Sequence, residues 1–227
     1  EYRVDATNAF VLLLISGISS VVLPFARASL SVELPPRKHT LFYALFMLCL
    51  TGLLGVVITG DAFNVFVFLE ISSLSTYVLI AQGASRDKRA LSSAYNYLIM
   101  GTIGATFFVI GIGFLYMTTG TLNMADLVDK LPFLLSSKAV VGGLLFMFIG
   151  LGIKMALVPF HVWMPDAYAN APDSISPILA SLVTKVALLA WVRIIYWVLN
   201  ATIVINDIPI LLLVAVLGAL AAVIGAS

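Results

Sequence analysis

The chain of 227 residues is 62% hydrophobic and only 10% charged, and its formal net charge is +1. Soluble domains carry roughly 25% charged and about 45–50% apolar residues, so a soluble fold of this length could not hide so much apolar surface. The near-neutral charge excludes the strongly basic footprint of a nucleic-acid-binding protein. The composition therefore predicts an integral, multi-pass membrane protein whose solvent is the lipid bilayer.

Seven stretches are long and apolar enough to cross the membrane as helices, which takes about 20 residues each. They cover residues 6–27, 39–60, 62–82, 91–118, 139–160, 174–199 and 208–227. Barrel strands are excluded because these runs are too long and lack a period of two. We therefore expect an all-α, polytopic bundle in a single membrane domain, residues 1–227. We also expect a fragment of a longer protein, since the chain opens on Glu1 and stops within an apolar run.

Lysine and arginine are distributed unevenly between alternate loops. The loops after the first and third predicted spans hold Arg27, Arg37, Lys38, Arg86, Lys88 and Arg89, and the opposite side holds Lys130 and Lys138. Cytoplasmic loops carry an excess of basic residues. The loops after spans one, three and five are therefore predicted to be cytoplasmic, in a prokaryotic cell membrane.

Small residues and the lone cysteine have structural interpretations. Gly101, Gly104, Gly111 and Gly113 of the fourth span predict close packing between helices. Cys49 lies in the apolar run LFMLCLTGL and is interpreted as a small buried hydrophobe, since one cysteine forms no internal disulfide. The sequence shows no zinc-ligand spacing, nucleotide-binding glycine loop or nucleophile elbow. No metal and no cofactor is expected in this chain, and whether it counts as an enzyme stays open.

Most charged residues lie in loops or at the ends of predicted spans, but three do not. Glu70 lies near the middle of the third span, Lys154 about two-thirds along the fifth, and Lys185 near the centre of the sixth. Each costs about 2.5–3.5 kcal/mol at a helix centre on the insertion scale. Polar contacts between membrane helices contribute only about 0.6 kcal/mol on average, which poorly offsets that cost. Ionisable residues within the membrane therefore predict a function, although an interhelical clip between Glu70 and one lysine remains the structural alternative.

Proton transfer is the chemistry that suits these side chains. Burial disfavours the charged form of an ionisable group, whereas a neighbouring opposite charge favours it. Lys154 would then release or recapture a proton as its distance from Glu70 changes, and Lys185 is the candidate next carrier. His161, in VPFHVWMPDAY, is a candidate relay because imidazole titrates at about pH 6.5, although a satisfied interfacial histidine suits the same position equally.

Prolines and other charged residues surround these candidates. Proline within a helix removes a hydrogen bond and kinks it, and broken helices in transporters line water-filled cavities. The prolines in question are Pro159, Pro165, Pro172 and Pro177, of which Pro177 equally suits the first turn of a helix. The residues interpreted as structural or as ordinary ends of spans are Asp61, Asp166, His39 and Arg193.

Three motifs carry a resemblance that covers nearly the whole chain. They are GDAFNVFVFLEISSLSTYVLIA, YNYLIMGTIGATFFVIGIGFLYMTTGTLNMADL and KMALVPFHVWMPDAYANAPDSISPILASLVTKVALLAWVR. They resemble the antiporter-like subunits of respiratory complex I and the large subunits of Mrp-type cation/proton antiporters and membrane-bound hydrogenases. The resemblance implies a bundle of about fourteen helices built from two inverted repeats, the first over roughly residues 39–199.

The resemblance also implies roles for the buried charges. Glu70 and Lys154 would form an ion pair that controls Lys185, and His161 looks like the family's relay histidine. The segment HVWMPDAY resembles complex I and hydrogenase subunits, whereas TGTLNMADL is common in the Mrp relatives. A hydrogenase-type complex that shares features of both branches would reconcile the two motifs.

Three functions follow as hypotheses. The first is a proton-translocating subunit of a redox-driven complex, without redox centres of its own. The second is a subunit of a sodium/proton antiporter, driven by an existing gradient. The third is a membrane scaffold whose buried charges only set helix packing. The expected partners are other membrane subunits, the lipid bilayer, and protons or sodium ions, with no nucleic acid.

Overall fold

The computed structural model describes residues 2–198, 204–205 and 208–226. The longer helices are α1 (Ala6–Glu33), α2 (His39–Ile58), α3 (Ala62–Gln82), α4 (Arg89–Thr119), α6 (Lys138–Lys154) and α10 (Ile210–Ala226). Shorter helices are α5 (Met124–Lys130), α7 (Trp163–Asn170), α8 (Ser176–Ile178) and α9 (Thr184–Val192). The all-α class is confirmed.

Short elements join or extend these helices. The 3₁₀ turns are η1 (Pro36–Lys38), η2 (Gly83–Ser85), η3 (Leu131–Phe133) and η4 (Phe160–Val162). Two π-helical stretches, η5 (Leu179–Val183) and η6 (Arg193–Val198), precede and follow α9. The strands β1 (Val204–Ile205) and β2 (Ile208–Pro209) form one antiparallel pair, with Ile205 opposite Ile208.

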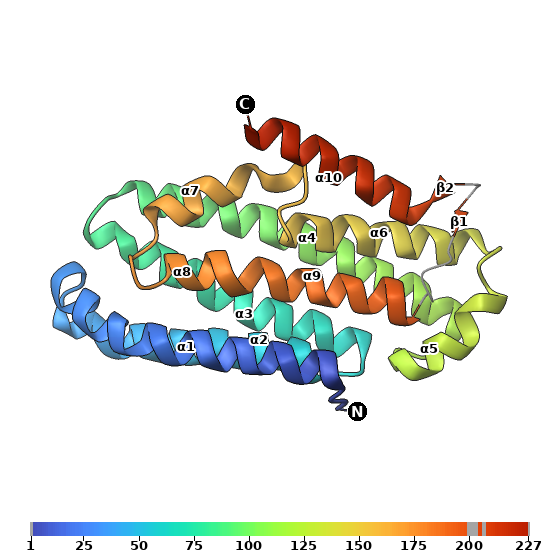
Figure 1. Cartoon of the computed structure of the whole chain (residues 1–227), viewed down its shortest axis with the longest axis horizontal. Coiled ribbons are helices and arrows are strands. Elements are labelled where there is room, and N and C mark those ends of the chain that lie inside the picture. Colours follow the sequence, from blue (N-terminus) through green and yellow to red (C-terminus); the bar gives the residue numbers. More distant parts are fainter. Residues whose placement is uncertain (1, 199–203, 206–207, 227) are drawn as a thin grey trace.

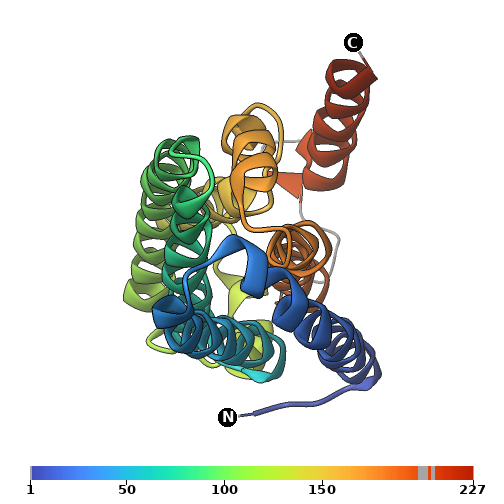
Figure 2. The same cartoon turned by 90° about the vertical axis from the view of Figure 1, so that its left-hand side faces the viewer.

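The helices pack into a closed ring. In chain order α2 contacts α3, α3 contacts α4, and α4 contacts α6, after which α9 closes the ring by contacting both α6 and α2. Figure 2 looks along this bundle, with α1 on the outside against α2, and Figure 1 shows the long helices side by side. The ring places the middle of α3 opposite the end of α6.

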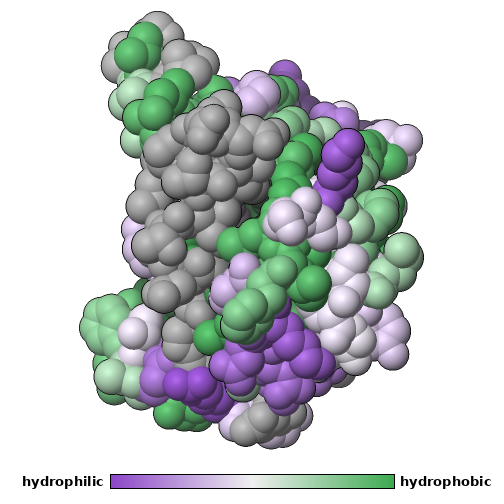
Figure 3. Space-filling view, turned by 90° about the vertical axis from the view of Figure 1, so that its right-hand side faces the viewer, coloured by the Kyte–Doolittle hydropathy of each residue, from purple (hydrophilic) through white to green (hydrophobic). Residues whose placement is uncertain are grey.

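Among the described residues, five helices are long and apolar enough to cross a membrane: Ala6–Glu33, Pro36–Ile58, Ala62–Ser85, Arg89–Thr119 and Ser176–Tyr196. Apolar side chains that remain exposed along them suit contact with lipid rather than water. They include Leu13, Val21, Val32, Leu91 and Met117. Figure 3 looks onto the end of the bundle that carries α5, where hydrophilic residues gather beside hydrophobic surface.

The predicted fifth span, residues 139–160, is wrong at its far end. The helix stops at Lys154, and Ala156 takes a positive φ of 57°. Pro159 has no backbone N–H and disfavours helical backbone at Val158, so the helix cannot continue through this segment. Lys154 is therefore the last residue of α6 rather than a residue two-thirds along a span. The predicted seventh span corresponds to α10, and residue 227 lies outside the described residues.

Glycines set the close approach of α4 and α6. A Cβ added to Gly111 would lie 2.5 Å from the carbonyl oxygen of Gly143, and one added to Gly150 would lie 2.6 Å from that of Gly104. In lipid, small residues at such crossings let two backbones touch. The predicted packing role is confirmed for Gly104 and Gly111, but it is wrong for Gly113, which faces open space.

Candidate functional site

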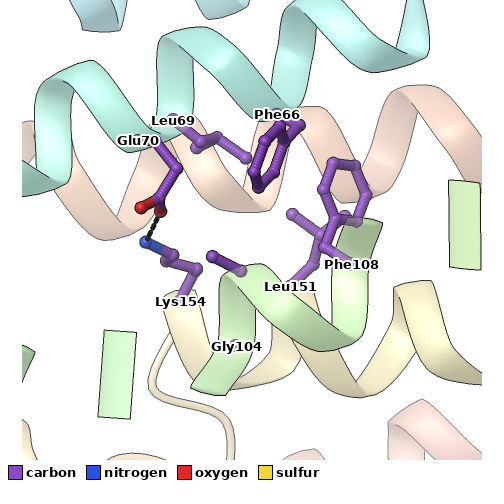
Figure 4. Close-up of a pocket in the computed structure, with 8 residues that line it drawn as sticks. Phe66, Leu69, Glu70, Gly104, Phe108, Leu151 and Lys154 are labelled. Atoms are coloured by element: carbon purple, nitrogen blue, oxygen red, sulfur yellow. Dashed lines mark hydrogen bonds and ion pairs between the residues drawn. The ribbon is translucent and has the colours of Figure 1, made fainter. Parts of the chain in front are cut away.

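The centre of the site is an ion pair between α3 and α6. The Lys154 Nζ lies 2.8 Å from Glu70 Oε1, and the side chains of Lys154 and Glu70 are 6% and 20% exposed. The same ammonium donates a second hydrogen bond to Ser73 Oγ at 2.7 Å. Glu70 and Ser73 are three residues apart on α3 and so share one face of that helix. Figure 4 shows the carboxylate and the ammonium pointing toward each other across the gap between the two helices.

The way α6 ends explains why Lys154 reaches this position. The backbone N–H of Leu157 donates to the carbonyl oxygen of Gly152 at 2.8 Å, and the Trp163 indole donates to that of Ile153 at 3.1 Å. Carbonyls at the end of a helix need such outside donors. A cation in the last turn is also stabilised by the partial negative charge of the helix end. The interrupted backbone thus presents Lys154 toward α3 from a helix terminus.

An aromatic column supports the same region. The Trp163 ring stacks on Tyr97 with centroids 4.3 Å apart, and Tyr97 meets Tyr77 edge-on at 4.7 Å. Gly101 makes room for this arrangement, since a Cβ there would lie 1.9 Å from the Tyr77 hydroxyl oxygen. The column joins α3, α4 and α7, and it ends beside Ile153, the residue before Lys154. The packing of four helical segments therefore holds Glu70 and Lys154 in position relative to each other.

Apolar side chains border the ion pair. The pocket that contains both charges is lined by Phe66, Leu69, Gly104, Ala105, Phe108 and Leu151 (Figure 4). In surroundings of low polarity an electrostatic interaction is stronger than in water, and an unpaired charge is more costly. A change in the distance between Glu70 and Lys154 would therefore have a large effect on which group holds a proton.

The structure places Lys185 away from this pair. Its side chain is exposed, and its Nζ donates to the carbonyl oxygen of Ala180 in the π-helical stretch η5. Among the described residues of the sixth span, the exposed positions are Pro177, Ala180, Lys185, Leu188 and Tyr196. Because the opposite faces pack on α2 and α6, Lys185 points out of the ring. The expectation that Lys185 is a buried charge is therefore wrong for this chain by itself. Its neighbouring π-helical stretch is a feature frequently found at functional sites.

His161 lies in η4, between the end of α6 and the start of α7. Its ring is half-buried, and within the described residues its buried Nδ1 has no hydrogen-bond partner. In the same part of the chain no hydrogen bond joins it to Glu70 or Lys154. The structure thus puts the candidate relay on the connection that follows Lys154 but does not bring it into contact with the ion pair.

Four other residues that the sequence analysis singled out have structural positions in the fold. Asp61 is the N-cap of α3 and accepts from the backbone N–H of Asn64 at 2.9 Å. His39 Nε2 lies 3.1 Å and 3.0 Å from the carbonyl oxygens of Leu30 and Leu34, at the end of α1. Pro177 stands in the first turn of α8, and Asp166 in the first turn of α7. Aspartate is favoured at the N-cap, acidic side chains are favoured in the first turn of a helix, and proline is favoured at the first helical position.

Arg193 is a second charged residue whose position the sequence reasoning misjudged. It is only 6% exposed, and its guanidinium donates to the carbonyl oxygens of Val56, Val57 and Thr59 at 3.1, 3.1 and 2.8 Å. These carbonyls lie at the end of α2, where the helix supplies no donors of its own. The partners are more than 130 positions away in the chain, so the sequence around Arg193 could not predict these contacts. Arg193 is an interhelical cap rather than an ordinary end-of-span residue.

Replacing Arg193 with glutamine should lower the free energy of unfolding by about 1–3 kcal/mol, the cost of leaving a buried polar group without its partner. Thermal unfolding of the purified protein measures this change. Arg27→Gln, which alters an exposed arginine on α1, is the matched control and should stay within about 0.5 kcal/mol of wild type. Equal stability of the two variants would contradict the capping role.

The fold and the ion pair define a multi-pass helical membrane protein with a buried pair of opposite charges between two of its helices. Comparison with known proteins identifies the family. Residues 59–227 match the family described as "NADH:quinone oxidoreductase/Mrp antiporter, TM". The chain belongs to this family, which confirms the resemblance seen in the sequence motifs.

Both branches of the family occur among the relatives. NADH-quinone oxidoreductase subunit N of Desulforudis audaxviator is 45% identical over 201 residues, which cover 88% of this chain and 39% of the relative. A Na(+)/H(+) antiporter subunit of Alkalihalophilus pseudofirmus is 31% identical over 83% of this chain and 37% of its own length. The chain therefore spans about two fifths of the length of each of these two relatives.

A solved structure also matches the fold. One chain of the membrane-bound sulfane sulfur reductase, described as an archaeal respiratory membrane complex, is 35% identical with a TM-score of 0.74. The match covers 81% of this chain and 36% of that one. The relative is thus a chain of a multi-subunit membrane assembly.

Proposed function

We propose that this chain forms part of a proton-translocating membrane subunit of a redox-driven complex, related to complex I or to membrane-bound hydrogenases. Glu70, Lys154 and Lys185 carry the protons, and His161 serves as a relay. The observation that carries the proposal is the buried Glu70–Lys154 pair, whose Nζ and Oε1 atoms are 2.8 Å apart. Ionisable groups held inside a membrane are a feature of proton pathways.

The pair acts as a switch in this mechanism. When the carboxylate lies beside the ammonium, the charged form of Lys154 is favoured, and when the two separate, the apolar pocket disfavours it. Lys154 then gives up its proton toward Lys185, which lies on α9, a neighbour of α6 in the ring. The other membrane subunits supply the conformational change that separates the pair. Residues 39–199 constitute the first of the subunit's two repeats.

The loops after spans one, three and five face the cytoplasm in this proposal. Two contacts support one common side for them. Lys38 Nζ donates to Ser85 Oγ at 3.0 Å, which joins the loops after spans one and three. Arg86 lies 3.2 Å from Asp173, which joins the loop after span three to the segment that follows span five. The basic residues of these loops therefore gather at one end of the bundle, as the positive-inside rule requires.

A sodium/proton antiporter subunit is the second candidate. The 31% identity to the Na(+)/H(+) antiporter relative favours it, and the ion pair suits either coupling. Redox-active subunits that copurify with the full-length protein support the first candidate. Proton flux that depends on a sodium gradient supports the second.

Proton pumping by the intact complex in proteoliposomes tests the proposal. Glu70→Ala and Lys185→Ala should each abolish pumping while leaving the complex assembled, because each removes a group that holds the moving proton. Arg27→Gln, an exposed change on α1, serves as the control and should pump as wild type does. Unchanged pumping in both test variants would mean that these charges only stabilise the packing of the helices.

A further inference from the structure

The buried side chains of the helix ring change character at the level of the Glu70–Lys154 pair. From Glu70 toward the η2 end, the ring buries hydroxyl and amide side chains: Ser72, Ser73, Ser75, Thr76, Gln82, Ser93, Ser174 and Thr184. In the other half, which ends at the turn between α2 and α3, the described side chains that the ring buries are apolar as far as Thr59 and Thr119 at its end, apart from Arg193. Because a charge among apolar groups is costly, only the first half favours the entry of a proton.

Arg193 stands at the far end of the apolar half. Its guanidinium donates to the carbonyl oxygens of Val56, Val57 and Thr59, and Thr59 itself is 0% exposed. A guanidinium keeps its charge at every pH that a protein meets. Arg193 therefore places a fixed positive charge across the end of the ring, between η6 and the end of α2.

Two further chain segments close this end around the turn between α2 and α3. The backbone N–H of Arg3 donates to the carbonyl oxygen of Ile58 at 2.9 Å, and that of Met124 donates to Gly60 at 2.9 Å. The N-terminus and α5, which begins at Met124, accordingly lie at the same end of the bundle (Figure 1). The turn is thus held from two sides, with the guanidinium buried beneath it.

The carboxylates of the adjoining segments are directed to their own helices. Asp5 accepts from the backbone N–H of Asn8 at 2.8 Å as the N-cap of α1, and Asp61 accepts from that of Asn64 at 2.9 Å as the N-cap of α3. Both aspartates are half-buried, whereas Arg193 is 6% exposed. The fully buried charge at this end is therefore the cation.

We propose that Arg193 is a positively charged barrier that stops protons from crossing the ring from end to end, an inference that rests on the proposed function. An arginine in a narrow passage is one of the groups by which membrane proteins exclude protons and other cations. A proton that has reached Lys154 then has no route through the apolar half. Lys185 lies in the same span as Arg193 but is exposed outside the ring, so it offers the remaining way out. The barrier directs the proton from Lys154 to Lys185.

Proton leak through the resting complex tests the barrier. The intact complex is reconstituted in proteoliposomes without an electron donor or a sodium gradient, a pH gradient is imposed, and its decay is followed. Arg193→Gln should dissipate the gradient at least tenfold faster than wild type, since a unit charge exerts about that factor even across about 12 Å at an effective dielectric constant of about 20. Arg193→Lys keeps the charge and should leak as slowly as wild type. Arg27→Gln, an exposed change on α1, is the control.

The two Arg193 variants separate charge from packing. Lysine does not reproduce the donor fork of a guanidinium, so both variants weaken the cap on α2, but only glutamine removes the charge. Equal leak in the two variants, or a leak in Arg193→Gln no faster than in wild type, would overturn the barrier. If Arg193→Gln does not assemble, Arg193→Met replaces it, and a leaky Arg193→Lys overturns the barrier by itself.

The leak assay involves no turnover and is therefore independent of pumping. A complex that pumps, loses pumping in Glu70→Ala and shows no leak in Arg193→Gln removes the barrier and leaves the proposed function standing. A wild-type complex that does not pump rejects the proposed function whatever the leak.

Discussion

Replacing Lys154 with methionine is expected to abolish proton pumping and to lower the free energy of unfolding by about 3–5 kcal/mol. The stability loss follows because the variant leaves Glu70 partly buried beside apolar side chains with no cation 2.8 Å away. The loss of pumping follows because the ammonium that accepts and releases the proton is gone. Thermal unfolding of the purified complex and pumping in proteoliposomes measure the two effects separately.

A double variant tests whether the pair serves stability or transport. Glu70→Leu combined with Lys154→Met replaces both charges by apolar side chains of similar volume, which is often neutral or stabilising for a buried pair. We expect the double variant to recover the stability lost in Lys154→Met but to remain unable to pump. Recovery of pumping together with stability would show that the pair is only an interhelical clip.

Gly150→Ala is expected to destabilise the protein and to slow pumping together. The added Cβ would lie 2.6 Å from both the carbonyl oxygen of Gly104 and the backbone nitrogen of Phe108. Neither atom can move by a side-chain rotation, so α4 and α6 must separate, and such overpacking costs about 1–3 kcal/mol. Lys154 lies one turn further along the same face of α6, so the shift also moves its ammonium relative to Glu70. Thermal unfolding and the pumping assay should both report the change.

Gly142→Ala is the matched control on the same helix. A Cβ at Gly142 meets nothing within 4 Å, and alanine is favoured over glycine within a helix by about 0.8–1.0 kcal/mol. This variant should be as stable as wild type or slightly more so, and it should pump normally. Similar behaviour of the two alanine variants would mean that the contact between α4 and α6 does not set the geometry of the site.

Local features of the sequence were enough to predict the class and the unusual residues. Long apolar runs predict membrane helices because a span must satisfy its backbone internally over about 20 residues. Glu70 and Lys154 stand out in such runs because a charge there is costly wherever the helix later packs. Pro159 and Pro165 likewise indicated interrupted backbone after Lys154, although the end of the helix at Lys154 itself was not predicted.

The inward face of each helix, in contrast, depends on tertiary packing. In a membrane both lipid-facing and protein-facing positions are apolar, so a span carries little periodicity that distinguishes them. The residues alone therefore predicted a bilayer-embedded helical protein with costly charges inside it, and the pairing of Glu70 with Lys154 was expected only from the family resemblance. The packing of α2, α3, α6 and α9 brings Glu70 to Lys154, turns Ser73 toward the same ammonium, buries Arg193 and leaves Lys185 exposed. Those contacts join residues 81 to 137 positions apart, which local sequence cannot encode.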